Sequence, residues 1–129
     1  MGDDLILHAS YLVIAPAWLA LLVAPDWRPT RLLIRSAVIS LVLAGLYLAL
    51  VLFRGGEDPD AGVWTMDELT ALFSDRRVVL IGWVHYLAFD LFVGSWVAAS
   101  AARDGIARLL VAPCLVFVCL LYTSDAADE

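Results

Sequence analysis

The chain has 129 residues, enough for one domain and too few for an additional soluble catalytic domain. Apolar residues make up 63% of it and charged residues only 17%, an excess that a soluble core of this size could not bury. The net charge of −6 includes no lysine, and the eight arginines are scattered near the ends of apolar stretches, which argues against a basic nucleic-acid surface. A lipid bilayer allows apolar side chains to face outward, so the composition predicts a membrane protein.

Three apolar stretches reach the ~20 residues that a helix needs to cross a bilayer. Residues 5–25 contain no formal charge, residues 32–53 contain only Arg35 near one end, and residues 78–102 contain only Asp90. A fourth apolar run covers residues 109–118. The sequence therefore predicts an all-α membrane protein, a four-helix transmembrane bundle formed by a single transmembrane domain over residues 1–118.

The final segment, residues 119–129, resembles the translation of a sequencing adapter joined to a truncated reading frame. On this interpretation the fourth helix is truncated after about ten residues, which rise ~15 Å, half the hydrocarbon thickness. We therefore assign no function to any residue after Val118.

The longest polar segment, residues 54–77, contains a helix-start signal. Thr65 and Glu68 have the spacing of a capping box, in which Thr65 caps the helix and Glu68 reaches back to the Thr65 amide. The short helix that follows either lies on the membrane surface or simply leads into the third span.

Arginine counts predict the orientation of the bundle. Five arginines belong to the first and third connections and three to the second: Arg28, Arg31, Arg35, Arg103 and Arg108 against Arg54, Arg76 and Arg77. Because arginine-rich connections stay on the cytoplasmic side, this count places the N-terminus outside.

Asp90 is the residue that most suggests a functional site. It lies twelve residues into the third span, or ~18 Å deep at 1.5 Å per residue, close to the bilayer midplane. An ionised carboxylate at that depth costs at least ~2.5–3.5 kcal/mol and usually accompanies a partner or a function. Two interpretations remain open: a substrate or proton site, or a polar cluster that fixes helix packing through interhelical hydrogen bonds.

Helix geometry at 100° per residue divides the neighbours of Asp90 between two faces. Tyr86, at i−4, shares the Asp90 face, whereas His85 lies ~140° away from it. The Asp90 face also includes Trp83, Leu87, Gly94 and Val97, and the His85 face includes Phe89, Phe92 and Trp96. If the spans pack antiparallel, His85 is level with Tyr47 and Ser10, and Asp90 is level with Ser40.

Metal and cofactor chemistry is not predicted. His8 and His85 lie on different spans without a second pair of ligands, so neither a metal nor a cofactor is expected. Cys114 and Cys119, five residues apart in one apolar run, are expected to be packing residues.

The run from Trp83 to Gly94 resembles the abscisic-acid-deficient-four-like family, small membrane proteins related to the plant protein required for neoxanthin synthesis. Supporting matches are Trp18, Pro25, Trp96, Asp104-Gly105-Ile106 and Pro113-Cys114-Leu115. The resemblance covers most of residues 5–118. This chain departs from the family at Ser95, where many relatives have arginine, and in the missing continuation of the fourth helix.

The resemblance implies a carotenoid reaction, in which an epoxide opens and an allene forms without net redox change. Such an isomerisation needs an acid at the epoxide oxygen and a base for a neighbouring C–H proton. The implied catalytic residues are a protonated Asp90 as acid, His85 as base, and Tyr86 beside Asp90. The implied substrate-binding residues are Trp83, Phe89, Phe92, Gly94 and Trp96. Because many relatives are bacterial, a bacterial cytoplasmic membrane is the expected location.

Two functions from different classes follow. The first is an isomerase-like or lipid-modifying enzyme acting on a carotenoid or another isoprenoid. The second is a non-catalytic membrane protein that binds or organises pigment, lipid or a membrane partner. Membrane lipid is the expected surrounding in both cases, and the sequence leaves the oligomeric state open.

Overall fold

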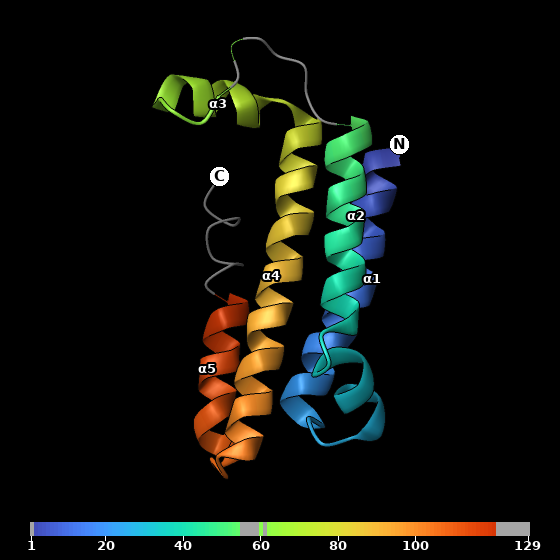
Figure 1. Cartoon of the computed structure of the whole chain (residues 1–129), viewed down its shortest axis with the longest axis vertical. Coiled ribbons are helices and arrows are strands. Elements are labelled where there is room, and N and C mark those ends of the chain that lie inside the picture. Colours follow the sequence, from blue (N-terminus) through green and yellow to red (C-terminus); the bar gives the residue numbers. More distant parts are fainter. Residues whose placement is uncertain (1, 55–59, 61, 121–129) are drawn as a thin grey trace.

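The computed structural model describes residues 2–54, 60 and 62–120, and this part of the chain is helical without a strand (Figure 1). The elements are α1 (Gly2–Val23), the π-helical turn η1 (Thr30–Ile34), α2 (Val38–Arg54), α3 (Met66–Ser74), α4 (Arg76–Arg103) and α5 (Arg108–Leu120). The all-helical prediction is confirmed. The four bundle helices correspond to the four predicted spans, and α3 is the short helix predicted before the third span.

Three segments are long and apolar enough to cross a membrane: Gly2–Val23, Thr30–Phe53 and Arg76–Arg103. The apolar part of α5, Arg108–Val118, is shorter. These lengths and compositions fit an integral membrane protein. The interpretation of residues 119–129 as an adapter artefact stays a prediction, because residues 121–129 lie outside the described part of the chain.

Helix α4 is the centre of the bundle, since it contacts α1, α2, α3 and α5 (Figure 1). Helices α1 and α2 run alongside it, α5 packs against its second half, and α3 lies across the end near the N-terminus. The larger core cluster joins α1 to α4 through Trp18, Leu21, Leu87 and Leu91. A smaller one joins α2 to α4 through Leu50 and Val84.

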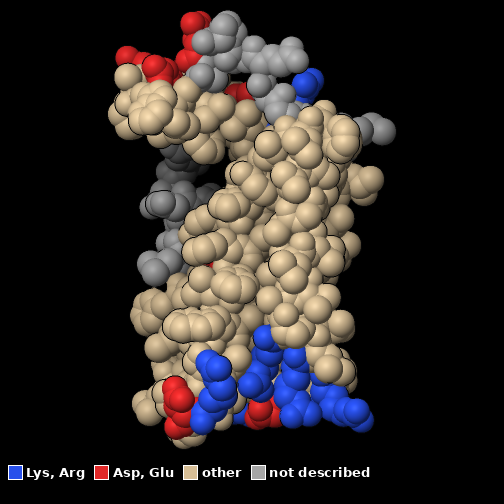
Figure 2. Space-filling view, in the orientation of Figure 1, with Lys and Arg blue, Asp and Glu red and all other residues tan. Residues whose placement is uncertain are grey.

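In the view of Figure 2, charged side chains gather at the two ends of the bundle and are almost absent along its middle. Leu12, Leu41 and Leu52 are 76%, 67% and 69% exposed on three different turns of α1 and α2. Exposing such apolar side chains to water would cost free energy, whereas contact with lipid tails would not. The arginines of the first and third connections gather at the end opposite the N-terminus. The orientation with the N-terminus outside remains a prediction based on that charge.

The start of the second span differs from a continuous helix over residues 32–53. A π-helical turn, in which the Arg35 amide donates to the Thr30 carbonyl at 2.9 Å, precedes α2. Ala37 then has a φ of 62°, so α2 begins at Val38. This break could not be predicted, because neither glycine nor proline lies between Thr30 and Val38.

The predicted cap of α3 is confirmed, with one change in its second hydrogen bond. The Thr65 hydroxyl accepts from the Glu68 amide at 3.2 Å. The Glu68 carboxylate accepts from the Trp64 amide at 3.1 Å, one residue earlier than the Thr65 amide that we predicted. The Phe73 ring lies 3.4 Å from where a Cβ at Gly82 would be, so α3 packs back onto α4. Whether α3 lies on a membrane surface stays a prediction.

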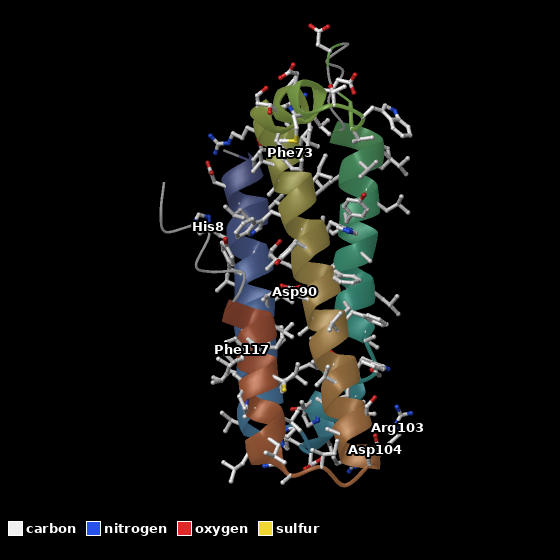
Figure 3. The ribbon with its side chains drawn as sticks, turned by 90° about the vertical axis from the view of Figure 1, so that its left-hand side faces the viewer. His8, Phe73, Asp90, Arg103, Asp104 and Phe117 are labelled. Atoms are coloured by element: carbon white, nitrogen blue, oxygen red, sulfur yellow. The ribbon has the colours of Figure 1, made fainter. Side chains whose placement is uncertain are left out.

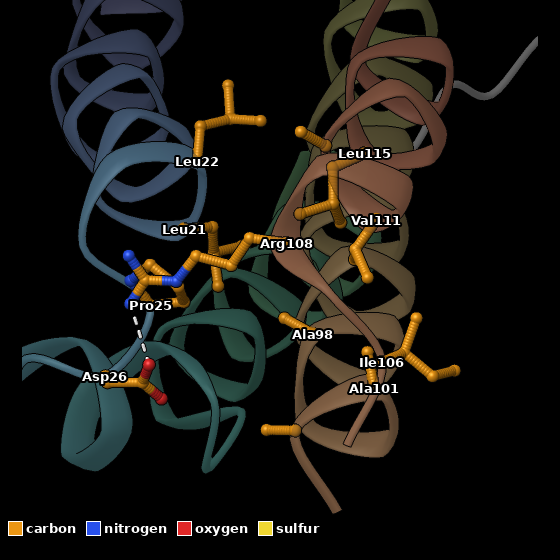
Figure 4. Close-up of a pocket in the computed structure, with 12 residues that line it drawn as sticks. Leu21, Leu22, Pro25, Asp26, Ala98, Ala101, Ile106, Arg108, Val111 and Leu115 are labelled. Atoms are coloured by element: carbon orange, nitrogen blue, oxygen red, sulfur yellow. Dashed lines mark hydrogen bonds and ion pairs between the residues drawn. The ribbon is translucent and has the colours of Figure 1, made fainter. Parts of the chain in front are cut away.

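Asp26 connects the first loop to the start of α5. Its carboxylate accepts from Arg108 at 2.7 Å and from Arg35 at 3.3 Å. The Arg108 pair spans the mouth of a pocket of about 100 Å³ between α1, α4 and α5 (Figure 4). The hydrogen bond from Arg108 lowers the pKa of Asp26 below its usual 3.8, although desolvation opposes the shift. The ionised form of Asp26 therefore stabilises the folded state.

The lowered pKa predicts how stability depends on pH. Asp26 holds its proton more weakly in the folded protein than in the unfolded chain. Its contribution to the free energy of unfolding is therefore present above pH 3.8 and is lost as the pH falls below that value. Asp26→Asn should lower the thermal midpoint in detergent micelles near neutrality, and the difference from wild type should narrow in acid. Asp104→Asn is the matched control, since it removes a carboxylate at the same end that makes no ion pair within the described residues. A difference that stays constant down to pH 3 would contradict this assignment.

The left-handed backbone at Ala37 predicts opposite outcomes for the same substitution at two alanines. Ala37→Gly should stabilise the chain by up to about 1 kcal/mol, because glycine adopts a positive φ without steric cost. Ala49→Gly, inside α2, should instead destabilise it by about 0.5–1 kcal/mol. Unfolding by SDS titration of the detergent-solubilised protein measures both. Equal destabilisation at the two positions would mean that Ala37 is part of a regular helix.

Candidate functional site

All eight residues proposed for the site lie on one helix, α4. Its first turn is capped by Asp75, whose carboxylate accepts from the Arg77 amide at 2.8 Å. The helix then runs without interruption to Arg103, so the site residues are held on a rigid element: Trp83, His85, Tyr86, Phe89, Asp90, Phe92, Gly94 and Trp96. Their positions relative to α1 and α2 decide which of them can act together.

One side of the motif packs against α1. The rings of Trp83 and Tyr11 meet edge to face, with centroids 6.3 Å apart. Gly94 lies directly against the Trp18 ring, since a Cβ added to Gly94 would be 2.6 Å from Trp18 Cη2. These two contacts identify the face of α4 that looks toward α1.

Asp90 belongs to this same face. At 100° per residue it lies within about 40° of Trp83, Tyr86 and Gly94. Figure 3 shows Asp90 near the middle of α4, on the side of α1. Its side chain is half-buried, and no hydrogen bond or ion pair to it occurs among the residues that the structure describes. The structure thus places a half-buried carboxyl group at mid-height of an apolar bundle.

The other side of the motif packs against α2. The His85 imidazole lies against the Tyr47 ring, with centroids 4.7 Å apart, as their predicted levels implied. His85, Phe89 and Phe92 line a groove of about 180 Å³ together with Ser40. Ser40, which was placed at the level of Asp90, therefore faces the His85 side. Ser10 donates to its own helix at the Ile6 carbonyl at 2.9 Å.

This arrangement separates the two groups that the resemblance paired as acid and base. Asp90 looks toward α1, whereas His85 contacts Tyr47 of α2. Two side chains on different sides of a packed helix cannot approach one reacting centre together. Tyr86, which shares the Asp90 face and is 42% exposed, is the nearer candidate partner in proton transfer.

The remaining aromatic residues of the motif face outward. Phe89, Phe92 and Trp96 are 59%, 49% and 61% exposed, so in a bilayer they would contact lipid or a bound apolar molecule. The structure adds Tyr11, Trp18 and Tyr47 to the surroundings of the motif. Tyr47 could be predicted from the sequence, because antiparallel packing of the spans puts it at the level of His85. No spacing rule in the sequence links Tyr11 or Trp18 to α4.

Metal ligands do not gather in the described ranges of the chain, where no group of three or more His, Cys, Asp or Glu side chains could hold an ion. His8 is exposed, and its Nδ1 lies 2.5 Å from the Asp4 carbonyl oxygen on its own helix. It does not approach His85.

Comparison with known proteins gives the family. The family model described as ABA DEFICIENT 4-like matches residues 5–123, nearly the whole chain. The chain belongs to this family. Neither the curated proteins nor the solved structures that were compared gave a match.

Membership of the ABA DEFICIENT 4-like family confirms the resemblance drawn from the Trp83–Gly94 motif. The structure also describes Ser95, where the resemblance implied an arginine. Ser95 is 1% exposed, and its hydroxyl donates to the Leu91 carbonyl at 2.6 Å. Ser95 also lines a groove of about 260 Å³ together with Arg35 and Arg103.

The contact between Gly94 and Trp18 predicts that no side chain is tolerated at Gly94. Gly94→Ala should destabilise the protein by about 1–3 kcal/mol, because the 6%-exposed Trp18 ring has little room to move. Gly45→Ala is the control, since a Cβ there meets nothing within 4 Å, and it should stabilise α2 by about 0.5–1 kcal/mol. Unfolding in detergent measures both variants.

A second variant tests the assigned cause. Trp18→Phe, combined with Gly94→Ala, should recover part of the lost stability because the smaller ring leaves space for the new methyl group. Additive losses in the double variant would show that the two residues do not touch.

Proposed function

We propose that the chain is a membrane-embedded, isomerase-like enzyme that acts on a carotenoid or another isoprenoid lipid. The observation that carries this proposal is the placement of Asp90, a carboxyl group at mid-height of an apolar bundle without a protein partner among the described residues. A buried ionisable group in a membrane helix usually serves a function. Family membership supports the neoxanthin-related theme.

The proposed chemistry is the opening of an epoxide coupled to loss of a neighbouring C–H proton. One group donates a proton to the epoxide oxygen as the C–O bond breaks, and another removes the carbon-bound proton as the new double bond forms. One proton is given and one is taken, so atoms and electrons balance without a redox cofactor. Asp90 and Tyr86, one helical turn apart on one face, are the pair that we propose for these two steps.

His85 has a different place in this proposal from the one that the resemblance implies. Its contact with Tyr47 directs it toward α2, away from the Asp90 face. We therefore assign the proton transfers to Asp90 and Tyr86. His85 is left as a residue of the α2 groove.

We propose that an elongated apolar substrate approaches Asp90 along a groove between α1 and α4. A groove of about 300 Å³ between α1 and α4 is lined by Leu7, Tyr11, Leu80 and Trp83, and its outer end carries Asp3, Asp4 and Arg76. Trp83 lies seven residues before Asp90 on the same face, which is about 10 Å along the helix. Apolar aromatic walls suit a polyene chain, and the polar outer end suits a hydroxylated ring.

Carotenoid analysis tests the proposal. The chain would be expressed in a host that accumulates several epoxide carotenoids, and pigments would be separated by chromatography. We expect a new isomer of unchanged mass in the wild type. Asp90→Asn and Tyr86→Phe should each reduce its formation by about 10²–10⁴-fold, the usual effect of losing a general acid or base. His85→Gln should reduce it much less.

Matched controls separate chemistry from folding. Asp104→Asn makes the same substitution in the turn after α4 and should leave product formation unchanged. Each variant must also reach the membrane in wild-type amounts. Unchanged pigments with a well-expressed wild type would overturn the proposal. Tight retention of pigment without conversion would instead establish the binding protein that the exposed aromatic row of Phe89, Phe92 and Trp96 also suits.

A further inference from the structure

A second groove, between the start of α2 and the second half of α4, has a cationic end and apolar walls. We call it the arginine groove. It has a volume of about 260 Å³ and is lined by Arg35, Ala37, Phe92, Trp96, Ala99 and Arg103, among others. It lies on the α2 side of α4, away from the Asp90 face, so its function does not depend on the proposed enzyme activity.

Positive charge is in excess at the end of the bundle where this groove opens (Figure 2). Five arginines and two acids belong to the first and third connections: Arg28, Arg31, Arg35, Arg103 and Arg108 against Asp26 and Asp104. Asp26 is shared between Arg35 and Arg108, so one carboxylate faces two guanidinium groups. Arg103 donates at 3.0 Å to the neutral hydroxyl of Ser100. The positive charge at the groove end is therefore only partly compensated by acidic side chains.

The walls become apolar toward the middle of the bundle. Trp96 and Phe92 are 61% and 49% exposed, and Phe92 lines both the arginine groove and the groove beside Ser40 and His85. The two grooves thus follow one seam between α2 and α4, from two arginines at the interface to apolar side chains at mid-height. Arg35 and Ala37, which precede the first turn of α2, both line the groove.

We propose that the arginine groove binds one anionic phospholipid, with its phosphate at Arg35 and Arg103 and an acyl chain along Trp96 and Phe92. Guanidinium groups pair with phosphate oxygens in a forked geometry, and the apolar side chains of Trp96 and Phe92 suit an acyl chain. A soluble phosphate compound would use the two arginines and leave the aromatic wall without a role. The charge gradient along the groove therefore favours a lipid.

Lipid titration into the detergent-solubilised full chain tests this proposal, with binding measured by native mass spectrometry and by the shift in thermal midpoint. Phosphatidylglycerol should bind at one site, whereas phosphatidylcholine of the same chain length and inorganic phosphate should not stabilise the protein. Arg103→Gln should weaken phosphatidylglycerol binding about fivefold, the value of one arginine near an anionic headgroup. Trp96→Ala should weaken it also, without changing the charge.

Controls at the same end of the bundle distinguish a site from general attraction. Arg28→Gln removes one positive charge outside the groove and should leave the binding unchanged. At Arg35 the substitution is to lysine, because Arg35→Gln would remove the positive charge that contacts Asp26. Arg35→Lys keeps this charge but loses the forked geometry of the guanidinium group, so it should weaken lipid binding. The proposal would be overturned if Arg28→Gln and Arg103→Gln weakened binding equally, or if phosphatidylcholine bound as well as phosphatidylglycerol. It would also be overturned if the protein were a dimer that Trp96→Ala dissociates, because a second copy of the chain would then occupy the groove.

Discussion

The contact between Trp18 and Gly94 sets how closely α1 and α4 approach each other. Because the indole ring lies on a position without a side chain, the two helices are near enough for Tyr11 to reach Trp83 further along the same interface. Asp90 lies between these two contacts on the same face of α4. The width of the space in front of its carboxyl group therefore depends on a packing contact one helical turn away.

The central position of α4 gives its two sides different surroundings. The side toward α1 combines aromatic rings with a carboxyl group, whereas the side toward α2 combines apolar walls with arginines at one end. A single helix can have two such different sides because its side chains project in all directions and its backbone hydrogen bonds are satisfied internally. The division also explains why residues adjacent in the motif, such as Phe89 and Asp90, have separate surroundings.

Much of this fold could be predicted from the sequence, because apolar runs of about 20 residues have few alternatives to membrane helices. The depth of Asp90 and its angular separation from His85 followed from helix geometry alone. The contacts across helices did not, since the sequence contains no signal for the rotation of α1 that brings Trp18 onto Gly94. The break at Ala37 was also invisible, because alanine normally favours a continuous helix.

The sharing of Asp26 between two arginines has a consequence for biosynthesis. Arg35 is nine residues from Asp26, whereas Arg108 is 82 residues away, so the partner in the first loop is synthesised long before the partner in α5. Asp26 can pair with Arg35 before α5 has been made. The same carboxylate therefore joins a loop that is synthesised early to a helix that is synthesised much later.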